Sequence, residues 1–178
     1  MNPKWYPNVP YSRLFPKVFT KEKERIQKYI TNVVIEHIGS TSVPNLDGKG
    51  YLDLIVCVQE ETMEGVKDIL ETKLGYEYKD DVSVKGERLF FKRIAQSKYS
   101  KKTFYHLHLT YLNSKYHKEA VSFRDFLINN PIYIKKYSEI KKIASKEAQK
   151  ANDRKEARII YKKIKDPLIN EILEKVSN

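Results

Sequence analysis

The sequence predicts an α+β fold, in which a mixed β-sheet is followed by a helical C-terminal third. Two apolar runs of strand length, residues 33–38 and 51–58, lie close together early in the chain, as expected of buried strands. Residues 62–74 then carry apolar side chains at helical spacing. From His117 onward, the remaining segments read as helices. This order predicts a sheet on which the C-terminal helices pack.

Local signals predict the other elements. Prolines and aromatic residues alternate in 1–16, so this segment is expected to be an extended arm. Residues 19–30 are expected to form the first helix, with Thr20 as its N-cap and with Ile26 and Tyr29 facing inward. The later elements are strands 76–78, 89–94 and 105–111, a polar hairpin turn at 95–103, and helices 119–129, 132–151, 154–165 and 168–176.

Proline and acidic residues divide the helical third. Pro131 stops one helix, and Asp153 offers a cap for a later one. Pro167 follows an acid, so a kink or a restart is expected before Leu168. No repeat or low-complexity tract separates domains. We therefore expect a single domain over 1–178, made of an α/β part with its arm (1–116) and a helical part (117–178).

Composition limits the function classes. Lysine and arginine number 34 against 23 acids, a net charge of +11 that favours a phosphorylated or polyanionic partner, although the lysines could merely keep the surface soluble. The single Cys57 excludes an internal disulfide framework and is expected to be a packed thiol. No apolar run has the length of a membrane helix, and the N-terminus lacks the apolar core of a signal peptide. A soluble, cytoplasmic protein without a membrane partner is expected.

A short polar loop and an acid stand at the ends of the first two predicted strands. Gly39 permits a close backbone approach, and Ser40 and Thr41 present hydroxyl and N–H groups that could hold phosphate oxygens. Asp53 on the neighbouring strand could hold a divalent cation, Mg²⁺ or Mn²⁺, that bridges those phosphates. The alternative is a tight turn beside a hydrogen-bonded buried acid.

The run EHIGSTSVPNL, followed by GKGYLDLIVCV, resembles the GrpB family, also called UPF0157, of the nucleotidyltransferase superfamily. Similarity extends over almost the whole chain, through HLHL at 106–109, SFRDFLINNP at 122–131 and the proline-rich arm. The resemblance implies a polymerase-β-like fold. It also implies a nucleotidyltransferase-like protein that binds a nucleotide phosphate with a divalent cation, and that could transfer a nucleotidyl group to an acceptor.

One position departs from the superfamily pattern, which places a second acid two residues after the first. The residue there is Ile55, whereas two alternating carboxylates normally hold the metal pair of phosphoryl transfer. The alternative is therefore a non-catalytic module on the same fold that binds a nucleotide or coenzyme A. Fusion of family members to a dephospho-CoA kinase makes the second ligand reasonable by resemblance.

Two histidines could replace the missing acid. His106 and His108 alternate on a strand, so both project to one face and could join Asp53 as metal ligands or catalytic acid–base groups. They could equally be hydrogen-bonded residues of a polar core. If His108 acts in the site, binding is expected to weaken below about pH 6.

Further basic residues are candidates for phosphate contacts. Lys49 precedes the second strand, and Arg124 lies on a helix where it could clamp an anion or pair with an acid. Tyr137 with Lys141, and Tyr161 with Lys165, have spacing that places each pair on one helix face. These pairs could line a phosphate site or be packed aromatics with snorkelling lysines.

The C-terminal tail gives the third functional alternative. Residues 135–178 hold 13 basic and 7 acidic residues, which is more than half of the excess charge. A basic helical face of this kind could bind RNA, although it could also be only a solvated surface.

Overall fold

The structure is a computed structural model that describes residues 5–97 and 100–177. Its centre is a five-stranded sheet with the order β1-β2-β5-β4-β3. Strands β2 and β5 are parallel and the other neighbouring pairs are antiparallel, so the sheet is mixed, as predicted. The strands are β1 (Val34–Ile38), β2 (Leu52–Val58), β3 (Glu77–Tyr78), β4 (Arg88–Ser97) and β5 (Ser100–Tyr111).

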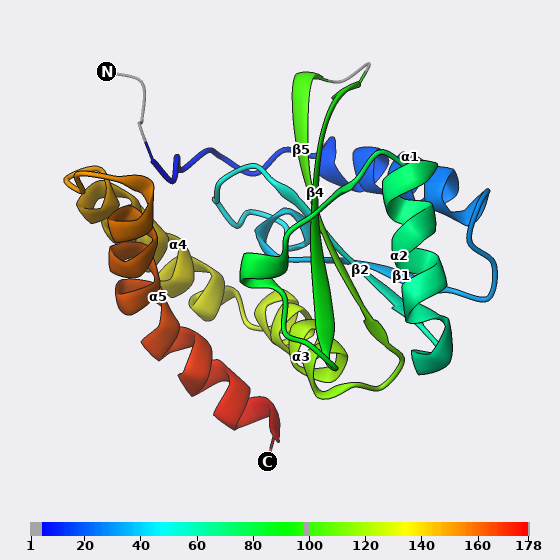
Figure 1. Ribbon diagram of the computed structural model, residues 1–178. Helices are drawn as coiled ribbons and strands as arrows, with labels where there is room; N and C mark the ends of the chain where they lie inside the picture. The colour runs from blue at the N-terminus through cyan, green and yellow to red at the C-terminus, as the bar shows by residue number, and fades with distance from the viewer. Residues whose placement is uncertain (1–4, 98–99, 178) are drawn as a thin grey trace.

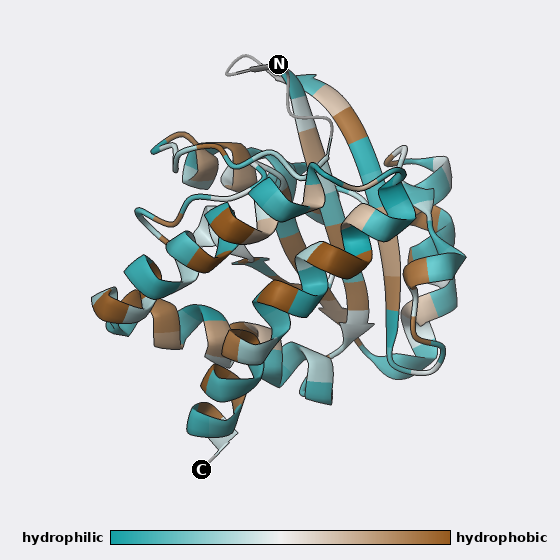
Figure 2. Ribbon diagram, turned by 90° about the vertical axis from the view of Figure 1, so that its left-hand side faces the viewer, coloured by the Kyte–Doolittle hydropathy of each residue, from teal (hydrophilic) through white to brown (hydrophobic). Residues whose placement is uncertain are grey.

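Helices cover both faces of the sheet (Figure 1). Two lie on one side, α1 (Phe15–Gln27) and α2 (Met63–Thr72). The C-terminal helices lie on the other side, α3 (Lys115–Asn129), α4 (Pro131–Ala148) and α5 (Arg154–Ser177). Figure 2 shows this second layer in front of the strands, with mostly hydrophilic turns toward the viewer and separate hydrophobic bands between them. No helix in the described ranges is both long and apolar enough to cross a membrane.

Strand alternation gives the sheet two unlike faces. On the face toward α1 and α2, leucines such as Leu54, Leu107 and Leu109 are fully buried in the main core. The opposite face carries Asp53 and the two strand histidines, and its apolar cluster is small. That cluster consists of Ile38, Ile55 and Cys57, with Tyr116 and Ala120 packed from α3. The predicted packed thiol at Cys57 is thus confirmed.

The first helix begins earlier than predicted. It starts at Phe15 with Pro16 in its first turn, where the missing proline N–H costs no intrahelical bond. Thr20 is therefore inside the helix and bonds back to the Pro16 carbonyl instead of capping it. Ile26 is buried as expected, but Tyr29 lies beyond the helix end and is 52% exposed.

One other boundary prediction was wrong. Strands β4 and β5 extend through most of the predicted turn at 95–103, because their ladder continues to Ser97 paired with Ser100. The part of that turn at 98–99 lies outside the described residues. Helix α5 runs through Pro167 without a break, so of the two outcomes expected there the restart does not occur. The predicted cap at Asp153 is confirmed by its carboxylate, which accepts from the Glu156 N–H at 2.8 Å.

The loop between β1 and β2 joins the sheet to the helical layer. Val43 and Leu46 are buried against Leu127, Tyr137 and residues of α5. In the same loop, the Gly48 backbone pairs with Val9 of the N-terminal arm through two hydrogen bonds, of 2.6 and 3.0 Å. The N-terminal arm, the β1–β2 loop and the C-terminal helices therefore meet beside the polar face of the sheet.

Candidate phosphate-binding site

Gly39 and Asp53 are in direct contact, as the positions of the predicted strand ends suggested. Asp53 is paired with Ile38 at the end of β1, which brings it beside the next residue, Gly39. Gly39 has φ 70°, and a Cβ there would lie 2.9 Å from the Asp53 Cβ and Cγ and would overlap a carboxylate oxygen. Only glycine fits both the backbone conformation and the space.

The hydroxyl groups of this loop have different surroundings. Thr41 is buried, donates to the Tyr51 carbonyl at 3.2 Å and lies 2.9 Å from the His37 Nε2. The Thr41 side chain therefore holds the loop in place and is not free for a ligand. Ser40 is half-buried and lies close to the Gly48 Cα, on the side of the loop that meets α4.

Asp53 and His106 form a hydrogen-bonded pair. The His106 Nδ1 lies 3.1 Å from the Asp53 Oδ1. Burial raises the pKa of Asp53, but the His106 hydrogen bond and the nearby positive charges outweigh it, so the net shift is downward. An ionised carboxylate can only accept, so Nδ1 carries a proton, and in the neutral imidazole Nε2 is then the acceptor. The pair thus holds His106 in the tautomer of a general base.

His108 is engaged elsewhere. The Tyr116 hydroxyl lies 2.7 Å from its Nδ1, and the Arg88 Nη1 lies 3.2 Å from the same atom. Burial lowers the pKa of His108 to about 3, and the Asp53 charge offsets only part of that effect. With a pKa that low, the His108 ring does not change charge near pH 6, and α3 places Tyr116 over the ring so that it is only partly exposed.

The proposed three-ligand metal set is not assembled. Asp53 and His106 are paired, but the described residues include no group of three His, Cys, Asp or Glu side chains placed to hold one metal ion. Ile55 occupies the second acid position and is fully buried on the same face as Asp53. One carboxylate near several lysines does not fit a pair of divalent ions.

Three predicted lysines converge near Asp53, and we call Lys49, Lys141 and Lys165 the lysine cluster. They come from the β1–β2 loop, α4 and α5 respectively. Their charges act on one another and on Asp53. The loop, α4 and α5 thus each place an ammonium group within electrostatic range of Asp53.

Lys49 lies among three tyrosine rings. Its Nζ is 5.0 Å from the ring centre of Tyr6, 5.4 Å from that of Tyr51 and 5.7 Å from that of Tyr161. Tyr6 and Tyr161 stack with their centres 4.6 Å apart. In the described part of the chain this ammonium group forms no hydrogen bond, so its donors are free for a ligand.

Lys141 is almost completely buried. Its Nζ donates to the Asp47 carbonyl at 2.6 Å and lies over the Tyr137 ring, one helical turn earlier, at 5.2 Å. A Cβ at Gly48 would lie 2.7 Å from this Nζ and would overlap the Ser40 hydroxyl. Gly48 is therefore required for Ser40 and Lys141 to approach each other.

Desolvation and mutual repulsion disfavour the charged form of the three lysines and lower their pKa values. Burial lowers the pKa of Lys141 to about 7, with a further contribution from Lys49, while Asp53 acts in the opposite direction. Burial also lowers the pKa of Lys49 and of Lys165. Lys165 has one acidic partner, Asp166, at 3.2 Å. Three desolvated ammonium groups share too little negative charge, which is the condition under which an anion binds favourably.

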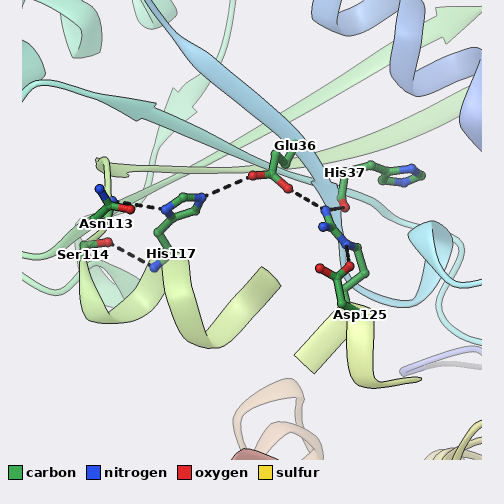
Figure 3. Close-up of polar contacts among 7 residues, drawn as sticks. Glu36, His37, Asn113, Ser114, His117 and Asp125 are labelled. Atoms are coloured by element: carbon green, nitrogen blue, oxygen red, sulfur yellow. Dashed lines mark hydrogen bonds and ion pairs between the residues drawn. The ribbon is translucent and has the colours of Figure 1, made fainter. Parts of the chain in front are cut away.

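Arg124 lies apart from this cluster, in a network around Glu36. Its Nη1 donates to the Glu36 carboxylate at 2.8 Å and to the His37 carbonyl at 3.0 Å, and its Nε donates to Asp125. His117 contacts the other Glu36 oxygen at 3.3 Å, so the carboxylate lies between two partners (Figure 3). Of the two alternatives for Arg124, the structure shows the pair with an acid of the protein itself.

Sequence reasoning missed three residues of the site. Gly48 is required beside Ser40, and Tyr6 and Tyr51 surround Lys49. The Gly48-Lys49-Gly50 triplet could have indicated a close backbone approach next to a lysine. The contact of Tyr6 with α5 depends on how the arm folds back, and a segment without periodicity carries no signal for that.

Comparisons with known proteins place the chain in a family. A family model described as "GrpB protein" matches residues 8–175. The chain belongs to the GrpB family. The glutamate-rich protein GrpB of Alkalihalophilus pseudofirmus is 29% identical over 139 residues, which cover 75% of this chain and 78% of that protein. The crystal structure of the conserved protein GrpB from Enterococcus faecalis has a TM-score of 0.69 at 25% identity, covering 93% of this GrpB chain and 98% of the other.

A more distant likeness confirms the fold class. The Cid1 poly(U) polymerase, in a structure bound to MgATP, has a TM-score of 0.53 at 12% identity. The match covers 81% of the GrpB chain described here and 46% of the Cid1 chain. The predicted polymerase-β-like nucleotidyltransferase fold is thus confirmed, although such low identity says nothing about activity.

Proposed function

We propose that this GrpB protein binds the phosphate groups of a nucleotide at the lysine cluster. The observation that carries the proposal is the convergence of Lys49, Lys141 and Lys165 beside the single acid Asp53. Charge-assisted hydrogen bonds from ammonium groups to phosphate oxygens are short and strong. A phosphate would supply the negative charge that the described residues around the cluster lack.

The neighbouring loop supports a phosphate ligand in the same place. The Ser40 hydroxyl has no hydrogen-bond partner in the described part of the chain, and it lies next to Gly48 and therefore near Lys141. Gly39 lets the Asp53 carboxylate approach the backbone of the loop closely. Tyr51 and Phe104 stack with ring centres 5.0 Å apart beside His106, which gives the site an aromatic border. A likeness in fold to a polymerase seen with MgATP makes a nucleotide the first ligand class to test.

A second candidate function, nucleotidyl transfer, is favoured by the Asp53–His106 pair. The carboxylate holds the imidazole through Nδ1, so the neutral form of His106 could accept a proton at Nε2 from the hydroxyl of an acceptor. The expected Mg²⁺ or Mn²⁺ has Asp53 as its single carboxylate here. Transfer would therefore depend on positioning and on charge neutralisation by the lysines.

Thermal unfolding with a ligand panel tests phosphate binding directly. The panel holds the four ribonucleoside triphosphates, coenzyme A, inorganic tripolyphosphate and the uncharged nucleosides as matched controls. A ligand at a hundred times its dissociation constant stabilises the folded state by about 2.7 kcal/mol. We expect the phosphate compounds, and not the nucleosides, to raise Tm, and Lys49→Gln to reduce that rise.

Two results would contradict the proposal. Equal shifts from nucleosides and nucleotides would show that phosphate is not recognised. A response to an RNA oligonucleotide alone, unaffected by Lys49→Gln but weakened by Lys162→Gln on α5, would favour the basic tail as an RNA-binding surface.

A further inference from the structure

We propose that the lysine cluster replaces the divalent cation, so that this GrpB protein binds a metal-free nucleotide polyphosphate in preference to its magnesium complex. The inference rests on the proposed function and specifies the form of ligand that the site accepts. Divalent ions neutralise phosphate charge in many nucleotide sites, where carboxylates hold them. Here the neutralising charges belong to side chains.

The first observation concerns the donor atoms of Asp53. One carboxylate oxygen is 3.1 Å from the His106 Nδ1 and accepts a hydrogen bond from it. The other lies so close to the Gly39 Cα that a Cβ on that residue would overlap it. Both oxygens therefore have near neighbours within the protein. An ion at Asp53 would need most of its ligands from water or substrate.

The second observation is that every nearby carboxylate is already paired. Glu36 faces Ile55 across the β1–β2 ladder, beside the missing acid position, but Arg124 and His117 hold both of its oxygens. Asp47 pairs with Lys142 at 3.3 Å. Arg124 would also oppose a cation brought to Glu36. Within the described ranges, Asp53 is thus the only acid left for a metal ion in this region.

The third observation is the sign of the local charge. Lys49, Lys141 and Lys165 stand against Asp53, Asp47 and Asp166. Asp47 also pairs with Lys142 and Asp166 with Lys162, so the region has a positive surplus before any ion binds. A divalent cation would add two charges to a site where lysines already repel one another. A free triphosphate has the opposite charge and no competing ion, so it complements the cluster better than its magnesium complex does.

Calorimetric titration with ATP distinguishes the two forms of the ligand. One series contains EDTA and the other contains excess Mg²⁺, both at about pH 7 and about 0.15 M ionic strength, conditions that limit non-specific attraction. We expect saturable one-site binding in EDTA, and an affinity about 3- to 10-fold weaker with Mg²⁺. Binding that is tighter with Mg²⁺, or that requires it, would overturn the inference while leaving the proposed function intact. Absence of binding in both series would contradict the proposed function itself.

Asp53→Asn supplies an independent test with an isosteric side chain. If the lysines alone neutralise the phosphates, removal of the opposing carboxylate charge leaves the affinity for metal-free ATP equal to or higher than that of the wild type. If Asp53 holds a bridging cation, the same change removes any gain from Mg²⁺ and weakens binding. The unfolding temperature of the variant without ligand shows whether it is folded. Lys49→Gln in EDTA keeps the inference testable if Asp53→Asn fails to fold, because an affinity unchanged by that substitution would contradict it.

Discussion

Two acids on opposite sides of the sheet have contrasting partners. Glu22 on α1 is 4% exposed and is bonded by Arg25 at 2.6 Å, by the Tyr76 hydroxyl at 2.7 Å and by Arg93 at 3.3 Å. Each donor reaches the carboxylate directly. On the polar face, Asp53 has one such partner, His106, while the lysine cluster influences it through charge without forming an ion pair in the described structure.

The contrast separates a structural network from a site prepared for a ligand. Around Glu22, charge and hydrogen bonds are matched within the protein, so the network needs nothing further. Around Asp53, burial and repulsion lower the pKa values of the lysines, which is a cost in stability that the protein itself does not recover. Groups held at such a cost are typical of functional sites.

The largest expected effect on stability is at Glu22. Glu22→Gln leaves two arginines without a carboxylate and should lower the free energy of unfolding by about 3 kcal/mol, measured by urea denaturation. Nucleotide affinity should not change. Glu64→Gln is the matched control, because Glu64 is exposed and its bond to Lys67 is long, 3.6 Å. If Glu22→Gln lowers the free energy of unfolding no more than the control does, Glu22 is not the centre of a stabilising network.

The lysine cluster should show the opposite behaviour. Loss of one charge-assisted contact costs about 1.5–3 kcal/mol, so Lys49→Gln should weaken nucleotide binding roughly 10- to 100-fold. The free energy of unfolding should stay within about 1 kcal/mol of wild type, since Lys49 has only ring contacts. Calorimetry and urea denaturation on the same preparations give both values, with Lys162→Gln as the exposed control. A destabilised variant with unchanged affinity would make Lys49 a structural residue.

Binding should weaken as pH rises above about 7. The pKa of Lys141 is about 7, and the groups that act on it are Lys49, Lys165, Asp53 and Asp47. The charged form binds phosphate, so affinity should fall by up to about tenfold per pH unit between about pH 7 and pH 9, with proton uptake on binding. Phosphate itself stays ionised over this range.

The contribution of Lys141 to the free energy of unfolding changes with pH in the opposite direction. Because the pKa of Lys141 rises on unfolding, the unfolded chain holds more protons above about pH 7, and this residue makes the free energy of unfolding increase with pH there. For nucleotide binding, calorimetric titrations in buffers of different ionisation enthalpy measure the proton uptake that accompanies binding, and Lys141→Gln should abolish that uptake. A profile that is equally steep in Lys141→Gln would assign the titration to another group.

The smallest expected effect is at the arm. Ser145 donates to the Tyr6 carbonyl at 2.6 Å, and Tyr6 is held in a left-handed conformation with φ 46°, so its ring is fixed over Lys49. Tyr6→Ala should weaken nucleotide binding about threefold, the size of one cation–π contact, whereas Tyr6→Phe keeps the ring and should match wild type. Equal losses in both variants would mean that the hydroxyl, not the ring, matters.

The parts of the molecule that local pattern determines were predictable. Alternation and strand ends predicted that Gly39 meets Asp53, and helical spacing predicted that Tyr137 and Lys141 share a face. Lys49 was a candidate for a phosphate contact because it precedes a strand, and Lys141 and Lys165 were candidates because each shares a helix face with a tyrosine. These predictions depend on short-range geometry, which the sequence displays directly.

Features that depend on docking between distant segments were not predictable. His108 is partly covered because Tyr116 of α3 packs over it, and strand alternation says nothing about which helix covers a face. Arg124 faces Glu36 and not the phosphate loop for the same reason. The early start of α1 is different, since Pro16 was read as a helix breaker although the first turn tolerates proline.

A crystal structure of the protein with a non-hydrolysable nucleoside triphosphate tests the central claim most directly. We expect phosphate oxygens within about 2.7–3.2 Å of the ammonium groups of Lys49 and Lys141, with the Ser40 hydroxyl as a further contact. Crystals grown without divalent cations should show the same placement. Phosphates bound to the exposed lysines of α5, with the lysine cluster unchanged and free of ligand, would contradict the account.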